Sequence, residues 1–151
     1  RTKIMKKPVA ILASLALTGS ILIGGTVPAL AGNCSYQFYD VSGLSKESYA
    51  ISWYDRNTKA VTGRDWVVKA TTITLPDSTT PSYGIAHVLY NVKTEAINTK
   101  NAWLKAPGRK VGQWLSTYGV KGELYGIGAR LDTNYKNGRG TTVGVFNSDA
   151  Y

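Results

Sequence analysis

The chain has 151 residues, of which 43% are hydrophobic and 18% are charged, and its formal net charge is +9. This length suits one domain with a substantial hydrophobic core. A single cysteine and a single histidine exclude an intramolecular disulfide framework, a zinc site of paired cysteines and a histidine-rich metal site, so we expect no cofactor.

The amino-terminal segment has the features of a bacterial secretion signal. Two lysines follow Met5, and an uncharged apolar run extends over residues 9–25. The small residues Ala29 and Ala31 occupy the two positions that signal peptidase inspects, so cleavage is expected after Ala31. The chain then divides into upstream read-through at 1–4, a cleavable signal helix at 5–31 and a single β-rich domain at 32–151.

Two alternatives would change where the protein resides. A permanent membrane anchor requires about 20 apolar residues, but the apolar run here is interrupted by Thr18, Ser20 and several glycines. A lipoprotein would carry its lipid on Cys34, but Asn33 stands where a small residue is required. We therefore expect a free extracellular or cell-wall-associated protein, with Cys34 either free or paired between chains.

The part of the chain after the signal is basic. Four of the 18 basic residues precede Gly32 and all nine acidic residues follow it, so the net charge falls from +9 to +5 once the signal is removed. A positive field of this size favours attraction to anionic walls, membranes or polymers, and it also aids solubility.

All 16 aromatic residues follow Gly32, where they are mixed with Val, Ile and Thr and interrupted by Gly, Pro and Asn. This composition favours pleated strands over helices. The alternating segments predict strands at residues 34–41, 49–54, 66–75, 85–93, 111–118, 123–131 and 141–147. Such a series predicts an all-β fold, a small antiparallel β-sandwich or barrel of about seven strands.

The alternation also predicts which side chains of a strand share a face. Side chains predicted to share a face are Tyr36 with Phe38; Val67, Lys69, Thr71, Ile73 and Leu75; and Tyr125, Ile127, Ala129 and Leu131, opposite Leu124, Gly126, Gly128 and Arg130. In the strand at 85–93, Ala86, Val88, Tyr90 and Val92 are the predicted core face, with His87 on the opposite face.

Three connections are predicted from local signals. Residues 55–58 have a turn composition, and loosely helical spacing predicts a short helix within residues 94–106. The pair Asn137-Gly138 is typical of a type I′ hairpin between the last two strands.

Few residues suit enzymatic chemistry. No Gly-x-Ser-x-Gly elbow accompanies Ser82 or any other serine, and a Cys34–His87 pair would place its nucleophile near the mature terminus. Glycoside hydrolysis needs two carboxyl groups at a set separation, and the spacing of the candidates does not select a pair. These candidates are Asp40, Glu95, Glu123 and Asp132.

One stretch combines cations with aromatic rings. Between Glu95 and Glu123 there is no acidic residue. Aromatic faces can stack on sugar rings or lie at a bilayer interface, and the cations can meet phosphates or carboxylates; an ordinary solvated face with its tryptophans in the core is the alternative. The candidate ligand-binding residues are Lys100, Trp103, Lys105, Arg109, Lys110, Trp114, Tyr118 and Lys121.

The tail carries a family resemblance. Residues 126–135 read Gly-Ile-Gly-Ala-Arg-Leu-Asp-Thr-Asn-Tyr, and residues 143–149 read Val-Gly-Val-Phe-Asn-Ser-Asp. The stretch from Glu123 to Tyr151 resembles an uncharacterised family of short secreted proteins of bacilli and related Gram-positive bacteria. That family usually ends in Gly-x-Trp-x-x-Asp, and Phe146 stands here in place of the tryptophan. The resemblance implies a secreted, single-domain protein and no particular activity.

Charge, aromatic content and the export signal together favour a secreted non-catalytic binding module for an anionic or carbohydrate surface such as the cell envelope. Its partners would be an anionic cell-wall polymer, a glycan or a membrane surface, with signal peptidase acting during export and no specific nucleic acid. The alternatives are a secreted bacteriocin-like or toxin effector and, third, a hydrolase of envelope polymer.

The export signal makes one measurable prediction. The mature protein in culture supernatant should begin at Gly32, because Ala29 and Ala31 frame that bond. Intact mass spectrometry checks this; a mass that retains residues 5–31, or a lipid on Cys34, would contradict it.

Overall fold

A computed structural model describes residues 32–116 and 118–150 of the chain. The expected read-through at 1–4 and the expected signal at 5–31 lie outside the described residues.

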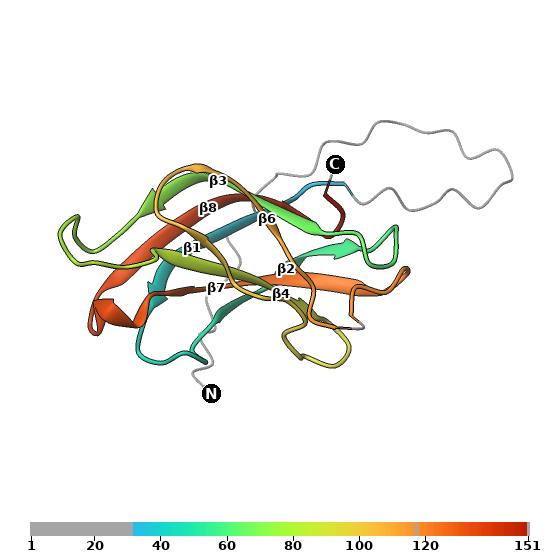
Figure 1. The fold of residues 1–151 in the computed structure, drawn as a ribbon, viewed down its shortest axis with the longest axis horizontal. Coiled ribbons are helices and arrows are strands. Elements are labelled where there is room, and N and C mark those ends of the chain that lie inside the picture. The colour runs from blue at the N-terminus through green and yellow to red at the C-terminus, as the bar shows by residue number, and fades with distance from the viewer. Residues whose placement is uncertain (1–31, 117, 151) are drawn as a thin grey trace, which may run out of the picture.

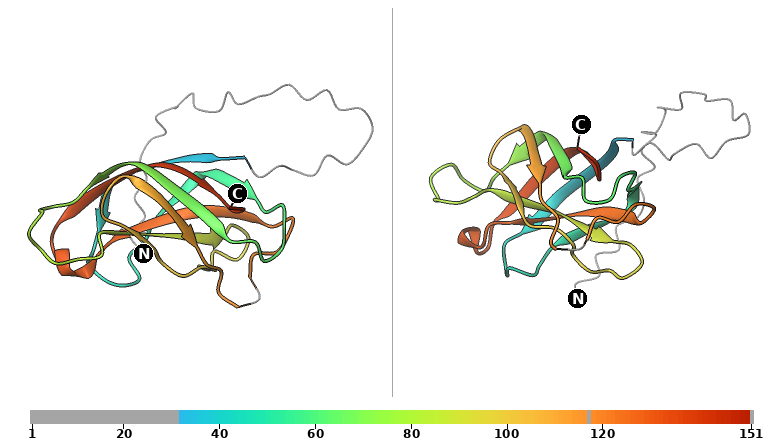
Figure 2. Two further views of the ribbon diagram at one scale, coloured as in Figure 1. Left: turned by 45° about the horizontal axis from the view of Figure 1, so that its top comes forward. Right: turned by 45° about the vertical axis from the view of Figure 1, so that its right-hand side comes forward.

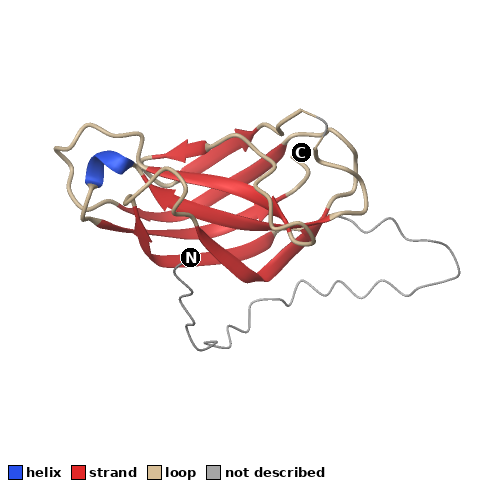
Figure 3. Ribbon diagram, turned by 90° about the horizontal axis from the view of Figure 1, so that it is seen from below, coloured by secondary structure: helices blue, strands red, loops and turns tan. Residues whose placement is uncertain are grey.

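The described chain is a β-sandwich, which confirms the predicted all-β class (Figure 1). One sheet has the strand order β1-β8-β3-β6 and the other β2-β7-β4-β5, and every pairing within them is antiparallel. The two sheets lie face to face (Figure 2), and a short 3-10 helix, η1 (Thr133–Tyr135), lies at one end of the sandwich (Figure 3). The strands are β1 (Cys34–Ser42), β2 (Ala50–Thr58), β3 (Trp66–Thr74), β4 (Ile85–Asn91), β5 (Ala102–Leu104), β6 (Gly108–Gly112), β7 (Leu124–Leu131) and β8 (Arg139–Asn147).

The core between the sheets contains the faces predicted for the strands that are β1 and β7 in the structure. Tyr36 and Phe38 of β1 share a face, as predicted, and this face is buried against the opposite sheet. On β7 the alternate residues from Tyr125 to Leu131 also share a face, as predicted, and all four are in the core. Fully burying a large apolar side chain contributes about 1.5–3 kcal/mol, so these alternating faces fix the way the two sheets pack.

The face predicted for β4 is wrong. Ile85 and Leu89 belong to the core, and His87 between them also faces the interior of the sandwich, where it contacts Tyr36 of β1. Ala86, Val88 and Tyr90 point the other way, yet they too are buried. Both faces of this strand are covered, so alternation alone could not distinguish the inner face from the outer one.

The outer face of the second sheet is covered by a bulge in β2. The register of β2 against β7 shifts between Ile51 and Arg56, so residues 52–55 bulge out of the ladder and the predicted turn at 55–58 is instead the end of the strand. The Tyr90 hydroxyl donates to the Ser52 carbonyl on this bulge. Gly126 of β7 leaves room for the Tyr90 ring, since a Cβ there would clash with it.

A second bulge changes the face of β3. The register against β8 shifts between Ala70 and Thr72. Before the shift the buried side chains are Trp66, Val68 and Ala70, so Val67 and Lys69 face away from the core. After it, Ile73 and Leu75 pack against the core, so the single face predicted for residues 67–75 is divided by the bulge.

Three connections also differ from the predictions. Residues 94–106 form no helix; they run beside β4 and include β5. Hydrogen bonds to β4 hold them there, for example the bond that the Leu89 backbone N–H donates to the Thr99 hydroxyl. The strand expected at 111–118 is the earlier and shorter β6. Asn137-Gly138 does not form a hairpin, because β7 and β8 belong to different sheets and η1 lies between them.

His87 is fully enclosed and neutral. Its Nδ1 lies 3.3 Å from the Ala102 carbonyl, which can only accept, so Nδ1 carries the proton and Nε2 accepts from the Thr142 hydroxyl at 2.9 Å. Burial lowers the pKa of His87 from 6.5 to about 4. This histidine therefore joins the two sheets by hydrogen bonds without carrying charge.

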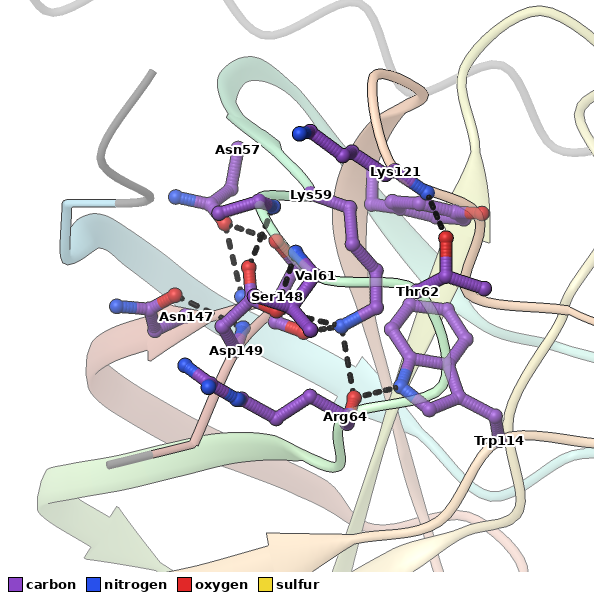
Figure 4. A network of polar contacts seen from close by, with 12 residues as sticks. Asn57, Lys59, Val61, Thr62, Arg64, Trp114, Lys121, Asn147, Ser148 and Asp149 are labelled. Carbon is purple, nitrogen blue, oxygen red and sulfur yellow. Dashed lines mark hydrogen bonds and ion pairs between the residues drawn. The ribbon is translucent and has the colours of Figure 1, made fainter. Parts of the chain in front are cut away.

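A second polar cluster anchors the carboxyl end of the described chain (Figure 4). The Lys59 ammonium donates to the carbonyl of Arg64 at 2.7 Å, to the carbonyl of Ser148 at 2.6 Å and to the Asp149 carboxylate at 2.8 Å. That carboxylate also accepts from the backbone N–H groups of Ala60 and Val61. Both side chains of the ion pair are completely buried. We call Lys59 and Asp149 the carboxyl-terminal ion pair.

The buried histidine predicts acid sensitivity. The unfolded chain takes up a proton on His87 below pH 6.5 while the folded protein resists protonation until about pH 4, so stability that is complete above pH 6.5 is lost as the pH falls. The loss over this window should be about 3 kcal/mol. Urea unfolding at several pH values measures it. His87→Gln should flatten the dependence, and an unchanged slope in that variant would contradict the assignment.

The carboxyl-terminal ion pair predicts a large, asymmetric mutational effect. Asp149→Asn leaves the Lys59 ammonium buried without a counter-charge, which should cost about 3–5 kcal/mol in the free energy of unfolding. Glu47→Gln, at an exposed carboxylate, is the control and should change it by less than about 0.5 kcal/mol. The double variant Lys59→Met/Asp149→Asn should lose less free energy of unfolding than the single variants Lys59→Met and Asp149→Asn lose in sum. Additive losses would mean that the pair is not coupled.

Candidate functional site

The basic residues predicted to bind a ligand are spread along one side of the sandwich. β5 and β6 are edge strands of the two sheets, and residues 105–107 connect them. Lys105, Arg109 and Lys110 are exposed along this connection. Arg109 pairs in register with Lys69 of β3, a cation that the sequence-based prediction missed. We call Lys69, Lys105, Arg109 and Lys110 the basic edge.

The other predicted cations lie away from the basic edge. The Lys100 ammonium donates to the Gln113 side chain at 3.3 Å. Lys121 and Tyr118 belong to the loop that precedes β7, and the Lys121 backbone N–H donates to the Thr62 hydroxyl. The eight predicted residues therefore do not form one patch.

Trp114 is held by contacts within the protein. Its indole N–H donates to the Arg64 carbonyl at 2.7 Å, and its ring meets Tyr125 edge-on at 4.7 Å between centroids. The Lys59 ammonium lies 4.9 Å from the ring centroid. Trp114 thus covers the carboxyl-terminal ion pair, a structural role.

Trp103, by contrast, lines a pocket. It lies on β5 opposite Ala86, and its ring is 5.6 Å from that of Tyr83, centroid to centroid. Four chain segments form a hollow of about 250 Å³ beside it, which we call the arginine pocket. Its lining residues are Lys46, Tyr83, Trp103, Arg130, Asp132, Thr133 and Asn134.

Arg130 is the buried cation of this pocket. It is next to last in β7 and lies on the outer face of its sheet, where it is only 6% exposed. Its guanidinium carbon lies 4.9 Å from the Trp103 ring centroid and 5.4 Å from that of Tyr49. These distances are those of cation–π contacts. The two rings therefore hold the guanidinium between them.

Asp132 builds the wall of the pocket. One carboxylate oxygen accepts from the Tyr83 backbone N–H at 2.7 Å, and the other accepts from the Asn134 backbone N–H at 3.0 Å. The Asn134 side chain in turn donates to the Pro81 carbonyl. These bonds join the loop before β4 to the segment after β7, and they hold the backbone of Tyr83 beside the pocket.

A similar hollow on the other sheet has no exposed aromatic side chain among its lining residues. It measures about 230 Å³ and includes Lys69 and Arg109 of the basic edge. Its one aromatic residue, Phe146, is 1% exposed because it belongs to the core. This hollow can attract anions, but it offers no ring for stacking.

Two of the acids considered for catalysis are far apart, and the side chains of Ser82, His87 and Cys34 are engaged in hydrogen bonds. Glu123 and Asp132 flank the eight-residue strand β7, so they are about 30 Å apart, far beyond the separation of a glycosidase pair, which is at most about 9.5 Å. The Ser82 hydroxyl donates to that of Tyr135, and both ring nitrogens of His87 are engaged elsewhere. Burial raises the pKa of the Cys34 thiol, which donates to the Arg56 carbonyl.

The described residues contain no group of three or more His, Cys, Asp or Glu side chains placed to hold a metal ion. No helix among them has the length and apolar character needed to cross a membrane.

Most of the arginine pocket was not predicted from the sequence. Trp103 was a candidate, but Lys46, Tyr83, Arg130 and Asn134 were not. They come from separate loops and strands, and no spacing in the chain relates them. The available signal was the alternation of β7, which places Arg130 on the face opposite the core, where a cation flanked by apolar residues is unusual.

The chain was compared with protein-family models, with curated proteins and with solved structures. None of the three comparisons gives a match.

Proposed function

We propose that this domain is a secreted, non-catalytic module that binds a carbohydrate or anionic surface, most simply that of the cell envelope. One observation carries the proposal: the arginine pocket presents Tyr83, whose side chain is 69% exposed, beside Trp103 and a buried guanidinium. An aromatic side chain that remains exposed in a fixed position is available for contact with a ligand.

The geometry of the pocket favours binding over catalysis. A general acid or base needs a proton that can move to or from a substrate. Asp132, the carboxylate of this pocket, already accepts two backbone N–H bonds that define the pocket wall. The other polar groups are a guanidinium, an ammonium, two hydroxyls, an amide and an indole N–H, which recognise ligands by hydrogen bonding.

The basic edge supplies long-range attraction. Lys105, Arg109 and Lys110 are exposed on or beside an edge strand, where cations also discourage pairing with the edges of other chains. Their field would concentrate the protein near an anionic polymer, while the arginine pocket would make the specific contact. The proposal therefore separates a salt-sensitive component of binding from a stacking component.

Co-sedimentation with purified Gram-positive cell walls tests the pocket. Tyr83→Ala should lower the affinity about fivefold, because one aromatic contact contributes about 1 kcal/mol. Tyr39→Ala is the matched control, since Tyr39 is 57% exposed but lies on β1 in the other sheet. Equal losses in both variants, or no binding by the unaltered protein, would overturn the proposal.

A charge-matched pair of triple variants tests the basic edge. Lys105→Gln/Arg109→Gln/Lys110→Gln should weaken binding at low salt, and the difference should shrink once the screening length falls below about 10 Å. The control, Lys93→Gln/Lys136→Gln/Arg139→Gln, removes the same charge from other exposed positions. If both triple variants lose the same affinity, net charge and not the basic edge is responsible.

Leakage from dye-loaded anionic vesicles would instead support an effector that permeabilises membranes.

A further inference from the structure

We propose that the arginine pocket binds one acidic sugar residue, with the sugar carboxylate on Arg130 and the sugar ring against Tyr83 and Trp103. This inference rests on the proposed function and specifies its ligand.

The first step is that the Arg130 guanidinium has more N–H donors than acceptors among the described residues. A guanidinium has five N–H donors, and the hydrogen bond found for Arg130 within the described chain is from Nη1 to the Leu131 carbonyl, at 3.3 Å. Its Nε is buried without an acceptor among the described residues, and no described carboxylate forms an ion pair with it. A buried charge is costly unless it is paired. A ligand oxyanion in this pocket would supply the counter-charge.

The second step concerns the kind of anion. The residues lining the pocket carry two positive charges, on Lys46 and Arg130, and one negative charge, on Asp132. A ligand with a single negative charge therefore neutralises the pocket. A phosphate monoester carries about −1.5 to −2 at pH 7, so it would exceed this balance and be repelled by Asp132. A carboxylate also matches the planar fork of a guanidinium.

The third step concerns size and shape. The pocket volume of about 250 Å³ exceeds the roughly 150 Å³ of a cavity that accepts a benzene ring, and it is smaller than the pockets of about 300–1,000 Å³ that hold drug-sized ligands. One six-membered sugar ring fits this range. The exposed ring of Tyr83 and the half-buried ring of Trp103 give such a ring apolar faces to contact. Neighbouring sugars of a polymer would extend into solvent.

The test uses matched probes on the unaltered protein. Glucuronic acid, galacturonic acid and N-acetylmuramic acid are titrated in turn, each beside its own methyl ester, which keeps the ring and removes the charge. Chemical shifts of the Arg130 Nε–H and the Trp103 indole N–H report the site by nuclear magnetic resonance. At least one acid should move both signals and bind about tenfold more tightly than its ester, the factor that a charge-assisted hydrogen bond supports.

Variants then separate the contributions. Lys46→Gln and Tyr83→Ala change exposed side chains, so they should fold normally and weaken binding of the acid. Lys93→Gln, the charge control, should leave it unchanged. Arg130→Lys keeps the charge but loses the fork and should weaken the acid about tenfold; if this variant does not fold, the shift mapping and the two exposed variants decide the question.

The outcomes distinguish the two proposals. Equal binding of acid and ester at the pocket overturns the carboxylate assignment and leaves a glycan-binding module. Failure of all three acids to shift the Arg130 signal overturns the acidic-sugar site, even if the protein still sediments with cell walls through other residues. Absence of both wall binding and sugar binding overturns the proposed function as well.

Discussion

Burial of the central strands β4 and β7 on both faces is the constraint on which the rest of this structure depends. Their inner faces pack against the opposite sheet, and their outer faces are covered by the β2 bulge and by the Tyr49 and Trp103 side chains. Alternate β7 residues on the outer face are glycines at 126 and 128, so the covering groups approach closely. Arg130, the next outward residue, is consequently buried between aromatic rings instead of reaching solvent.

The domain contains two buried cations that differ in how fully they are paired. The three donors of Lys59 all have acceptors, and its carboxylate partner is itself anchored by backbone N–H groups. Arg130 is held by ring faces and one carbonyl. A fully paired buried ion fixes structure, whereas a cation with unused donors can bind an anion. This contrast separates the carboxyl-terminal ion pair from the arginine pocket.

These two cations lie toward opposite ends of the sandwich, and the basic edge runs along its side. Trp114 belongs to the first end, where it covers Lys59, and Trp103 belongs to the second, where it covers Arg130. The two tryptophans therefore serve different purposes despite their similar surroundings in the sequence. Near the carboxyl end of the described chain, Phe146 fills the core and Asp149 pairs with Lys59, so these residues act in folding.

The sequence by itself determined the strand-rich class, an antiparallel sandwich or barrel, and the residues that share a face in β1 and β7, because the large apolar residues of these strands alternate with mainly polar, charged or glycine residues. It could not orient β4, since apolar residues occupy both faces of that strand and the alternation has no preferred sense. Tertiary structure alone decided the bulges at residues 52–55 and 70–72, where a shift in register reverses the buried face. The extended path of residues 94–106 depends on hydrogen bonds to β4, which are distant in the chain. The arginine pocket combines side chains from four segments, and only the tertiary packing around β7 brings Arg130, Tyr83 and Trp103 together.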